Sequence, residues 1–508
     1  MNPASPLTGP WTGVNAVVLG LARQGAELCR FLHREGASVT GCDRAAIDLA
    51  TLATDGRPTK LRLRFGRQDS ALLTGCGLMA LSAGVPTDLE VVQAARRSRI
   101  PVVNDMMLTF AASRATTTVV TGSNGKTTTT ALAGALMQAA HPERTVHVGG
   151  NIGRPLLTEA RDFGPRDRLV WEASSFQLEL FRTEWTQTPL RDACRIRTAV
   201  LTNVTPNHLD RHAGMLDYLQ AKLNLLDLLN GDSTLILDAD DPVCRRLLPA
   251  TQQQFKAVDP PLPQAGACHE LLADMEASLT RRAVCRIAVS RRHALPDGFS
   301  LAGNRIRFNG QDVLSLDRFR PRGAHNRTNA LLAVAATLTD HRCTASLQHV
   351  LDTFAGIPHR LEEVPGPAGT TWINDSIATS PERAVAGIRS MRTGDGPLVL
   401  LAGGRDKGLA WNAFAAEVCE RVQTLIVFGE AQAGIVRAME GVGRRLNGTS
   451  IVKADCFEAA VSEAGLRVRP GGTVLLSPGG TSFDSHPDFA ARGDHFRLLA
   501  SRLRDEAA

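Results

Sequence analysis

The sequence lacks several features that would assign it to a special class of protein. Aromatic residues make up 5% of its 508 residues, and Tyr218 is the only tyrosine. The ten cysteines show no CxxC spacing, which argues against a zinc or dithiol site and is typical of reduced thiols in the cytosol. No run approaches the roughly 20 apolar residues that span a bilayer, and no apolar segment follows basic residues at the N-terminus. These absences predict a cytoplasmic protein without membrane insertion.

The charge of the chain also lacks a strong excess of either sign. There are 57 basic and 51 acidic residues, which gives a net charge of +6. Without a basic tail or interleaved arginine and aromatic residues, a nucleic-acid partner is not expected, and the small excess favours small anionic ligands. With 43% hydrophobic and 21% charged residues, the composition is typical of a globular α/β protein, and the length predicts about three domains.

The first part of the chain predicts a nucleotide-binding half-sheet. Residues 14–44 read as a strand, a glycine-bearing turn from Gly20 to Gly25, a helix and a second strand that ends at Asp43. Such a βαβ unit, with an acidic residue about 20 positions after the turn, is the general plan of these half-sheets. The turn "GLARQG" lacks the middle glycine of the dinucleotide fingerprint, so a tight turn without a ligand is the alternative interpretation.

The pattern restarts near residue 115 with a short β-branched run, the loop "TGSNGKTT" and a helix. Only two residues lie between Gly122 and Gly125, whereas the usual phosphate loop has four residues between its first glycine and the Gly-Lys pair. The glycines allow backbone N–H groups to turn inward, Lys126 supplies positive charge, and Thr127 offers a hydroxyl to a metal ion. The stretch predicts nucleotide binding, against the alternative of a helix cap beside a solvated lysine.

Further strands are predicted at 145–150, 168–174 and 198–204, which gives a parallel sheet with helices on both faces. Four polar side chains then follow strands at the carboxyl edge of this sheet: Lys126, Asn151, Glu172 and His208. Glu172 is placed to hold Mg²⁺ on the phosphates, unless it caps a helix. His208 belongs to the same site or is a structural histidine.

Lys222 lies on the apolar stripe of a helix predicted over 215–229. It comes three residues after Leu219 and four before Leu226. A lysine that faces inward tends to lose its proton, unless its stem extends to water. A neutral amine near Mg²⁺ could react with CO₂ to form a carbamate, which would turn a cation into a metal-binding anion.

The remaining chain predicts two further regions. Residues 251–320 carry turn residues and short alternating runs, which predict a less regular insertion with a hairpin or two. A third unit begins around 356–364, and strands at 397–404, 424–429 and 472–478 give it an α/β sheet of its own.

Nine motifs occur in the order seen in one enzyme family. They are "TGSNGKTT", "GGNIG", "EASSFQLE", "NVTPNHLDRH" with a following "AK", "GAHNRTNALLAVAA", "IPHRLE", "NDSIATSPE", "GGRDKG" and "LSPGGTSFD". The chain resembles the Mur ligases, and among them most closely the branch that adds D-glutamate to UDP-N-acetylmuramoyl-L-alanine.

The resemblance implies an α/β fold of three domains. Residues 1–114 would form a Rossmann-like UDP-sugar domain, 115–356 a phosphate-loop ATPase-like parallel-sheet domain, and 357–508 a Rossmann-like domain that binds the amino acid. It also implies a monomeric ADP-forming amide ligase of peptidoglycan precursor synthesis. The reaction would use ATP and two Mg²⁺ ions and pass through an acyl phosphate.

The resemblance further implies roles for particular residues. Catalytic roles fall on Lys126, Glu172, His208, Lys222 and Asn151. The ATP-binding residues are Gly122, Ser123, Asn124, Gly125, Lys126, Thr127, Thr128, Asn329, Arg360 and Asp375. Metal binding is assigned to Thr127, Glu172, His208 and a carbamylated Lys222. Contacts to the UDP substrate are assigned to Asp43, Arg44, Ser82 and Asn151, and contacts to the acceptor amino acid to Thr379, Lys407, Ser482 and Phe489.

Two positions depart from the family pattern. Many members of the branch have a lysine where this chain has Ile377, and His486 replaces a common aromatic residue. The acceptor therefore stays open between D-glutamate and another amino acid such as L-glutamate. A protein that binds ATP as a switch, without ligation, is the alternative of a different class.

Overall fold

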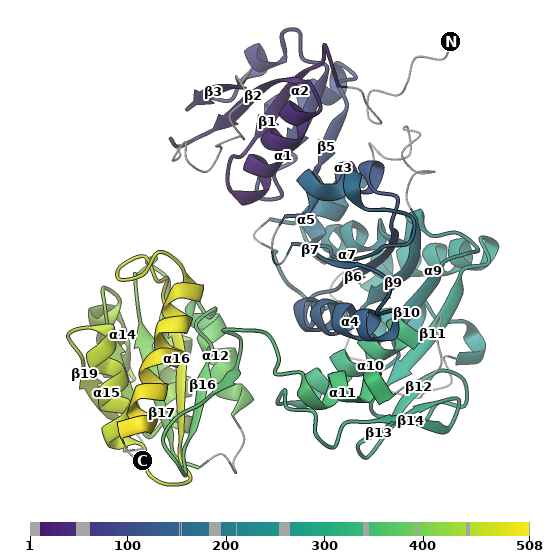
Figure 1. The fold of residues 1–508 in the computed structure, drawn as a ribbon. Coiled ribbons are helices and arrows are strands. Elements are labelled where there is room, and N and C mark those ends of the chain that lie inside the picture. The colour runs from purple at the N-terminus through teal and green to yellow at the C-terminus, as the bar shows by residue number, and fades with distance from the viewer. Residues whose placement is uncertain are drawn as a thin grey trace, which may run out of the picture. The chain divides into compact units, whose positions relative to one another are not determined.

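The structure is a computed structural model that divides into two compact units. It describes residues 11–46, 61–151, 153, 155–181, 195–209, 211–252, 265–338, 345–391, 394, 396–442 and 448–506. The first unit comprises Met1–Arg318 with His325–Asp352, and the second comprises Phe319–Ala324 with Thr353–Ala508. The first unit holds two sheets and the second unit holds one (Figure 1). The mixed α/β class is confirmed, while the bounds of the three predicted domains stay predictions.

The first sheet has five parallel strands in the order β3-β2-β1-β4-β5. Its elements are β1 Asn15–Leu19, α1 Arg23–Arg34, β2 Ser38–Asp43, β3 Leu61–Phe65, β4 Leu78–Leu81, α2 Glu90–Arg97, β5 Val102–Asn104 and α3 Asp105–Ala112, with a short 3₁₀ helix at Ser70–Leu73. The predicted βαβ unit is confirmed. A Cβ atom on Gly25 would lie 1.6 Å from the carbonyl oxygen of Gly20, so the close start of α1 on its turn requires glycine.

The second sheet has nine strands in the order β14-β13-β12-β11-β10-β9-β6-β8-β7. In this order, the strands from β12 through β6 to β7 all run parallel to their neighbours. Strand β13 is antiparallel to both β12 and β14. The strands are β6 Thr116–Thr121, β7 Val146–Gly150, β8 Arg168–Glu172, β9 Ile196–Leu201, β10 Thr234–Asp238, β11 Cys285–Ser290, β12 Phe299–Ala302, β13 Arg305–Phe308 and β14 Gln311–Ser315. The helices are α4 Lys126–Ala140, α5 Ser175–Leu178, α7 Met215–Leu223, α8 Pro242–Arg246, α9 Ala265–Arg281, α10 Ala324–Leu338 and α11 Ala345–Thr353. Short 3₁₀ helices lie at Leu157–Asp162, Glu179–Phe181, Leu226–Leu228 and Ala250–Gln252.

The prediction for residues 251–320 is only partly right. The hairpins are present as β12, β13 and β14, but α9 and β11 continue the regular parallel sheet instead of interrupting it. Helix α9 buries Cys268, Leu272, Met275 and Leu279, whose spacing of four, three and four residues is that of one helix face. The turn-rich stretch 253–264 before α9 lies outside the described residues.

The third sheet has six strands in the order β15-β16-β20-β17-β18-β19, of which only β15 is antiparallel to its neighbour. Its strands are β15 Glu362–Val364, β16 Thr371–Asn374, β17 Leu398–Gly403, β18 Thr424–Phe428, β19 Ser450–Lys453 and β20 Thr473–Gly479. Its helices are α12 Pro381–Ser390, α13 Asn412–Arg421, α14 Gln432–Gly441, α15 Phe457–Arg467 and α16 Phe489–Glu506. One core contains α12, α13 and α14, and a second core, on the other face, contains α15 and α16 (Figure 1). The predicted α/β sheet of this region is confirmed.

Polar contacts join the first two sheets inside the first unit. Glu27 of α1 is buried and accepts a hydrogen bond from the backbone N–H of Thr158 at 2.9 Å. Arg161 pairs with Glu35 at 2.8 Å. Within the described part of the chain, no helix is both long enough and apolar enough to cross a membrane.

Candidate nucleotide and metal site

The glycine loop between β6 and α4 is closely packed against two other segments. A Cβ atom on Gly122 would lie 2.0 Å from Thr202 Oγ1, and one on Gly125 would lie 2.2 Å from Asn329 Oδ1. Both residues also have positive φ, 145° and 82°. The loop therefore needs glycine at both positions, for space and for backbone conformation. Asn329, predicted from the family pattern to bind nucleotide, lies on α10 directly beside the loop.

Two lysine side chains converge on one carbonyl oxygen of this loop. Lys126 Nζ donates to the Gly122 oxygen at 2.9 Å and to the Ser123 oxygen at 3.0 Å. Lys222 Nζ donates to the same Gly122 oxygen at 2.7 Å. Two ammonium groups this close repel each other, which favours loss of a proton from the more buried one.

Lys222 is that buried lysine. Only 2% of it is exposed, so the interpretation that its stem extends to water is wrong and the inward orientation is confirmed. Its amine lies 4.6 Å from the ring centre of Tyr218, whose hydroxyl bonds Ser123 Oγ at 2.8 Å. Burial holds the pKa of Lys222 well below its ordinary value, nearby Lys126 lowers it further, and Glu172 opposes the shift.

Glu172 ends β8 opposite Val120 of β6 and Gly150 of β7. It is 2% exposed, and its Oε1 accepts a hydrogen bond from Asn151 Nδ2 at 2.9 Å. Its Oε2 is buried and has no hydrogen-bond partner among the residues that the structure describes. Helix α5 is capped by Ser174, so the capping interpretation of Glu172 is wrong.

The two histidines near this edge have different surroundings. His208 is exposed, has a positive φ of 54° and lies with its ring 5.1 Å from that of Phe176. His212 is buried between Ser175 Oγ at 3.0 Å and Asp217 Oδ2 at 3.1 Å. His212 was not predicted, because nothing in its spacing distinguishes a buried histidine from an exposed one.

The residues at this edge of the sheet fit a magnesium ion that takes its remaining ligands from substrate phosphates and water. A buried carboxylate oxygen without a partner in the described part of the chain, Glu172 Oε2, is a ready ligand, and Thr127 lies in the first turn of α4, next to the loop. Over the described ranges, no three His, Cys, Asp or Glu side chains gather closely enough to hold a metal by themselves. Magnesium commonly uses one or two carboxylates together with phosphate oxygens and water, and the donor set matches that habit.

The candidates for the UDP substrate lie around the first turn of the first sheet. Asp43 Oδ2 accepts a hydrogen bond from the backbone N–H of Leu21 at 2.7 Å, and a Cβ atom on Gly20 would lie 3.1 Å from Ser82 Cβ. Arg44 is exposed. Asp43 and Ser82 are therefore brought together at the turn.

Arg23, on the same turn, was not predicted. Its guanidinium donates to the carbonyl oxygen of Gly153 at 2.6 Å and lies 3.5 Å from that of Asn151. It therefore links this turn to the loop after β7, a contact across about 130 residues that no local pattern reveals.

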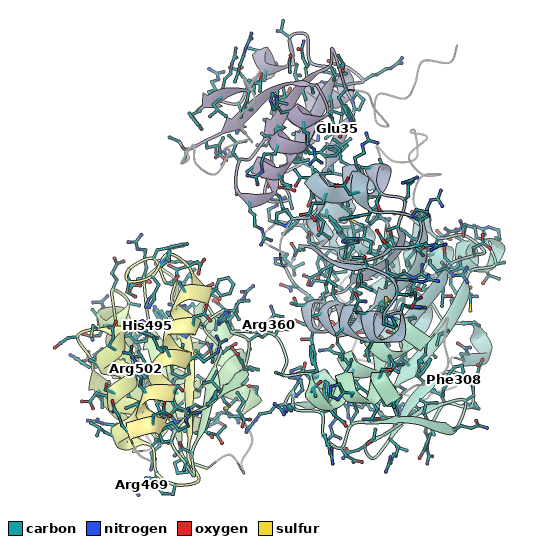
Figure 2. All side chains as sticks on the ribbon, viewed as in Figure 1. Glu35, Phe308, Arg360, Arg469, His495 and Arg502 are labelled. Atoms are coloured by element: carbon teal, nitrogen blue, oxygen red, sulfur yellow. The ribbon has the colours of Figure 1, made fainter. Side chains whose placement is uncertain are left out.

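The candidates in the second unit lie at the carboxyl edge of the third sheet. Asp375, just after β16, accepts from Ser477 Oγ at 2.9 Å and from the Leu361 N–H at 3.3 Å. Burial raises the pKa of Asp375 to about 7. Arg360 precedes β15 (Figure 2).

The acceptor candidates follow three strands of the same sheet. Thr379 follows β16, Lys407 follows β17, and Ser482 follows β20. Ser482 is buried, Thr379 is half-buried, and Lys407 is exposed. Phe489 begins α16 and is exposed.

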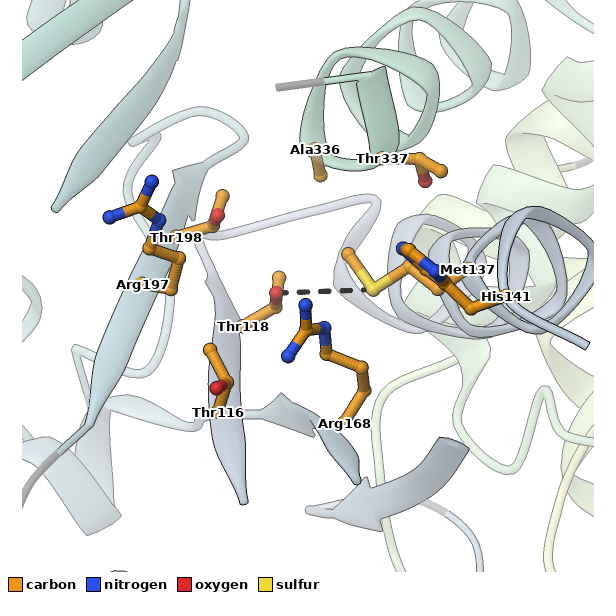
Figure 3. A pocket seen from close by; sticks show the side chains of 9 residues that line it. All are labelled: Thr116, Thr118, Met137, His141, Arg168, Arg197, Thr198, Ala336 and Thr337. Carbon is orange, nitrogen blue, oxygen red and sulfur yellow. Dashed lines mark hydrogen bonds between the residues drawn. The ribbon is translucent and has the colours of Figure 1, made fainter. Parts of the chain in front are cut away.

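A pocket lies at the opposite end of the strands of the second sheet (Figure 3). It is lined by Thr116, Thr118, Met137, His141, Arg168, Arg197, Thr198, Ala336 and Thr337. These residues come from the beginnings of β6, β8 and β9, the end of α4 and α10. The glycine loop is at the carboxyl ends of the strands, so this pocket is separate from the candidate nucleotide site.

The second sheet and its glycine loop have the architecture of phosphate-loop proteins. Residues 120–260 match the Mur ligase middle domain, and residues 359–480 match the Mur ligase glutamate ligase domain. The UDP-N-acetylmuramoylalanine--D-glutamate ligase of Pelotomaculum thermopropionicum is 34% identical over 97% of this chain and 99% of its own length. The ligase of the same name from Symbiobacterium thermophilum is 34% identical over 96% and 98%. The chain belongs to the Mur ligase family.

Solved structures of related folds support the fold of this chain. The UDP-N-acetylmuramate-alanine ligase MurC of Thermotoga maritima is 15% identical over 96% of this chain and 99% of its own, with a TM-score of 0.52. A pseudomurein peptide ligase type C from Methanothermus fervidus is 15% identical over 97% and 100%, with a TM-score of 0.50. At this identity the two structures support the fold and nothing finer.

Proposed function

We propose that the protein is an ATP-dependent ligase that joins D-glutamate to UDP-N-acetylmuramoyl-L-alanine in peptidoglycan precursor synthesis, releasing ADP and phosphate. The full-length relatives carry the name of this reaction. The observation in the structure that carries the proposal is the convergence of Lys126 and Lys222 on the phosphate loop beside the buried Glu172. This edge suits a reaction that starts at the terminal phosphate of ATP.

The proposed reaction has two steps. A carboxylate oxygen of the alanyl group forms a bond to the γ-phosphorus of ATP while the bond to the β-phosphate oxygen breaks, giving an acyl phosphate and ADP. The neutral amine of glutamate then forms a bond to the acyl carbon, the bond between that carbon and the phosphate oxygen breaks, and phosphate leaves while the nitrogen releases one proton. Lys126 offers positive charge to the phosphates in the first step, where two anions must approach each other.

The residues of the edge would hold two Mg²⁺ ions. Thr127 and Glu172 are the proposed ligands of one ion, and His208 and a carbamylated Lys222 are those of the other. When bound, these ions neutralise charge on the phosphate and carboxylate oxygens. Asn151 orients the Glu172 carboxylate through its 2.9 Å hydrogen bond.

The carbamate on Lys222 is supported by the burial of its amine. A neutral amine attacks CO₂, an N–C bond forms, and one proton is released. The depressed pKa of Lys222 increases the share of the amine that is neutral at a given pH. The product carries a negative charge at the position where the free lysine would repel a metal ion.

The other substrates are assigned to the turn of the first sheet and to the second unit. The UDP substrate would contact Asp43, Arg44 and Ser82, with Asn151 near the reacting carboxylate. The ATP would contact the loop residues 122–128 with Asn329, Arg360 and Asp375. Acceptor binding is assigned to Thr379, Lys407, Ser482 and Phe489. We propose that the enzyme acts as a monomer in the cytoplasm.

L-glutamate is the second candidate acceptor. Ile377, half-buried in the loop after β16, places an apolar side chain among the acceptor candidates. A change in the contacts on this side would alter the choice between the two stereoisomers.

The proposal is tested by product formation from UDP-N-acetylmuramoyl-L-alanine and ATP with D-glutamate, L-glutamate or no amino acid. We expect a dipeptide product by mass spectrometry and stoichiometric ADP only with D-glutamate. Lys126→Ala is the control for contaminating ATPase. ADP release without an acceptor would reject the ligase reaction in favour of an ATP-driven switch, and a preference for L-glutamate would reject the D-isomer as the acceptor.

A further inference from the structure

Arg492 of α16 is a completely buried charged residue in the second unit, with 0% of it exposed. Its Nε donates to Ser376 Oγ at 3.0 Å, and its Nη2 donates to the Ser376 carbonyl oxygen at 2.9 Å. Both terminal nitrogens donate to the Gly480 carbonyl oxygen at 3.2 Å. Each of these acceptors is an uncharged oxygen, so the hydrogen bonds satisfy the guanidinium without cancelling its charge.

The guanidinium lies where three loops of the third sheet meet. Ser376 belongs to the loop after β16, and Gly480 belongs to the loop after β20. A Cβ atom on Gly404, in the loop after β17, would lie 2.8 Å from Arg492 Nη1. These are the three loops that carry the acceptor candidates Thr379, Lys407 and Ser482.

The contacts also tie the loops to the start of α16. Ser376 Oγ accepts from Arg492 and donates to the carbonyl oxygen of Phe489 at 2.7 Å. Arg492 is three residues further along the same helix. A single guanidinium therefore fixes the loop after β16, the loop after β20 and the first turn of α16.

Burial of the Arg492 charge is energetically unfavourable, which indicates that the charge has a function. Burying a cation without a bonded anion is unfavourable, and a neutral side chain could fill the same space. Burial lowers the pKa of Arg492 to about 10, with Asp484 opposing the shift, so the group stays positive at neutral pH. A fixed positive charge under the three loops makes their surface favourable to anions.

We propose that Arg492 is a positioning and specificity residue, which holds the three acceptor loops in register and favours an acceptor with a negatively charged side chain. The proposal rests on the proposed function, because it takes these loops as the acceptor site. Arg492 acts through Ser376 and Gly480 and does not itself contact the substrate.

The test compares acceptors that differ only in side-chain charge. D-Glutamate and D-glutamine share an α-carboxylate and an amine, but the side chain of D-glutamine is neutral. For Arg492→Gln we expect a KM for D-glutamate raised about tenfold and a preference for D-glutamate over D-glutamine reduced about tenfold, with the KM for ATP unchanged. Arg492→Lys keeps the charge and should restore the preference while leaving the KM for D-glutamate raised, since an ammonium cannot bridge both loops.

Arg497→Gln is the matched control. Arg497 lies on the same helix but bonds Glu362 at 2.7 Å, outside the three loops. Removal of its charge should leave the KM for D-glutamate and the preference unchanged. Equal losses toward D-glutamate and D-glutamine in Arg492→Gln would overturn the specificity role, and an unchanged KM for D-glutamate would overturn the positioning role.

A second pair of variants covers a failure of Arg492→Gln to fold. Ser376→Ala removes the acceptor of Arg492 Nε and keeps the charge. A raised KM for D-glutamate in both Ser376→Ala and Arg492→Lys supports the positioning role, and wild-type KM values in both would overturn it. Lack of glutamate turnover by the wild-type enzyme would instead reject the proposed function, which separates the two failures.

Discussion

Each of the two units buries a cation beneath the loops at the carboxyl edge of a mainly parallel sheet, Lys222 in the first unit and Arg492 in the second. Lys222 in the first unit donates one hydrogen bond, to the Gly122 oxygen, and faces the Tyr218 ring. Arg492 in the second unit donates four, to Ser376 and Gly480. A lysine can lose its proton when buried, whereas an arginine stays charged and binds through a planar fork. The edge with Lys222 is thus suited to a buried group that changes its charge. The edge with Arg492 is suited to a fixed charge that holds its loops in place.

The largest expected effect is at Lys222. Both Lys222→Ala and Lys222→Arg should lower kcat by roughly 100- to 1,000-fold, because neither can form a carbamate to bind the metal. Added formate or acetate should restore part of the activity of Lys222→Ala and none of that of Lys222→Arg, in which the cavity is filled. Steady-state ADP release measures both. Lys453→Ala, on β19 of the second unit, is the control that should keep full activity. An active Lys222→Arg enzyme would break the distinction between the two buried cations.

A smaller effect is expected at Glu172. Glu172→Gln should lower kcat by about 100-fold and raise the Mg²⁺ concentration needed for half activity, because the oxygen without a partner is no longer part of an anion. The same change should leave the melting temperature equal or higher, since it removes a buried charge. Calorimetry and Mg²⁺ titration of activity separate the two properties. Loss of stability together with an unchanged Mg²⁺ requirement would assign Glu172 a structural role.

The patterns that were local in sequence predicted most of this fold. The β-branched run before Gly122, the glycine spacing and the apolar stripe of Lys222 all depend on residues a few positions apart, and the structure confirms the strand, the loop and the buried lysine. Helix α9 also had a local signal, the spacing of Cys268 to Leu279. That signal was overlooked because the turn residues around it suggested an irregular region.

The contacts that complete the candidate sites could not be predicted in the same way. Arg492 falls four residues before Phe496 and eight before Ala500, both buried, so its inward direction could have been inferred by the argument used for Lys222. Its partner Ser376, however, is 116 residues away in the chain. Hydrogen bonds over such separations depend on how strands are ordered in the sheet, and local spacing does not specify that order.

A still smaller effect is expected at Asn151, the residue that orients Glu172. Asn151→Ala should weaken the apparent Mg²⁺ affinity by about 10- to 100-fold, because a carboxylate without its 2.9 Å hydrogen bond is no longer fixed in direction. Mg²⁺ titration at saturating ATP measures the change. Asn304→Ala, which removes a hydrogen bond to Asp317 near β14, is the control. Equal Mg²⁺ affinities in wild type and Asn151→Ala would contradict the orienting role.

The smallest expected effect concerns stability alone and is at Asp238, a buried acid of the first unit. Burial, with a contribution from Asp240, raises the pKa of Asp238 to about 8. The folded protein then binds this proton more tightly than the unfolded chain, so its contribution to stability falls as pH rises from about 4 through about 8. Asp238→Asn should therefore unfold less readily than wild type at pH 9, by about 1–3 kcal/mol, and show no such gain near pH 4.

Denaturant unfolding at both pH values checks the prediction for Asp238. Asp232→Asn, in the exposed turn before β10, is the matched control for loss of an acidic charge. A gain for Asp238→Asn that is equal at pH 4 and pH 9 would show that the carboxyl group does not titrate over this range.

The contrast between the two buried cations is tested most directly by carbon-13 NMR of the enzyme in labelled bicarbonate. We expect one carbamate signal in the wild type, its loss in Lys222→Ala and its retention in Arg492→Lys. A wild-type spectrum without a carbamate signal in the presence of Mg²⁺ and a non-hydrolysable ATP analogue would contradict the assignment of Lys222 as a metal-binding anion.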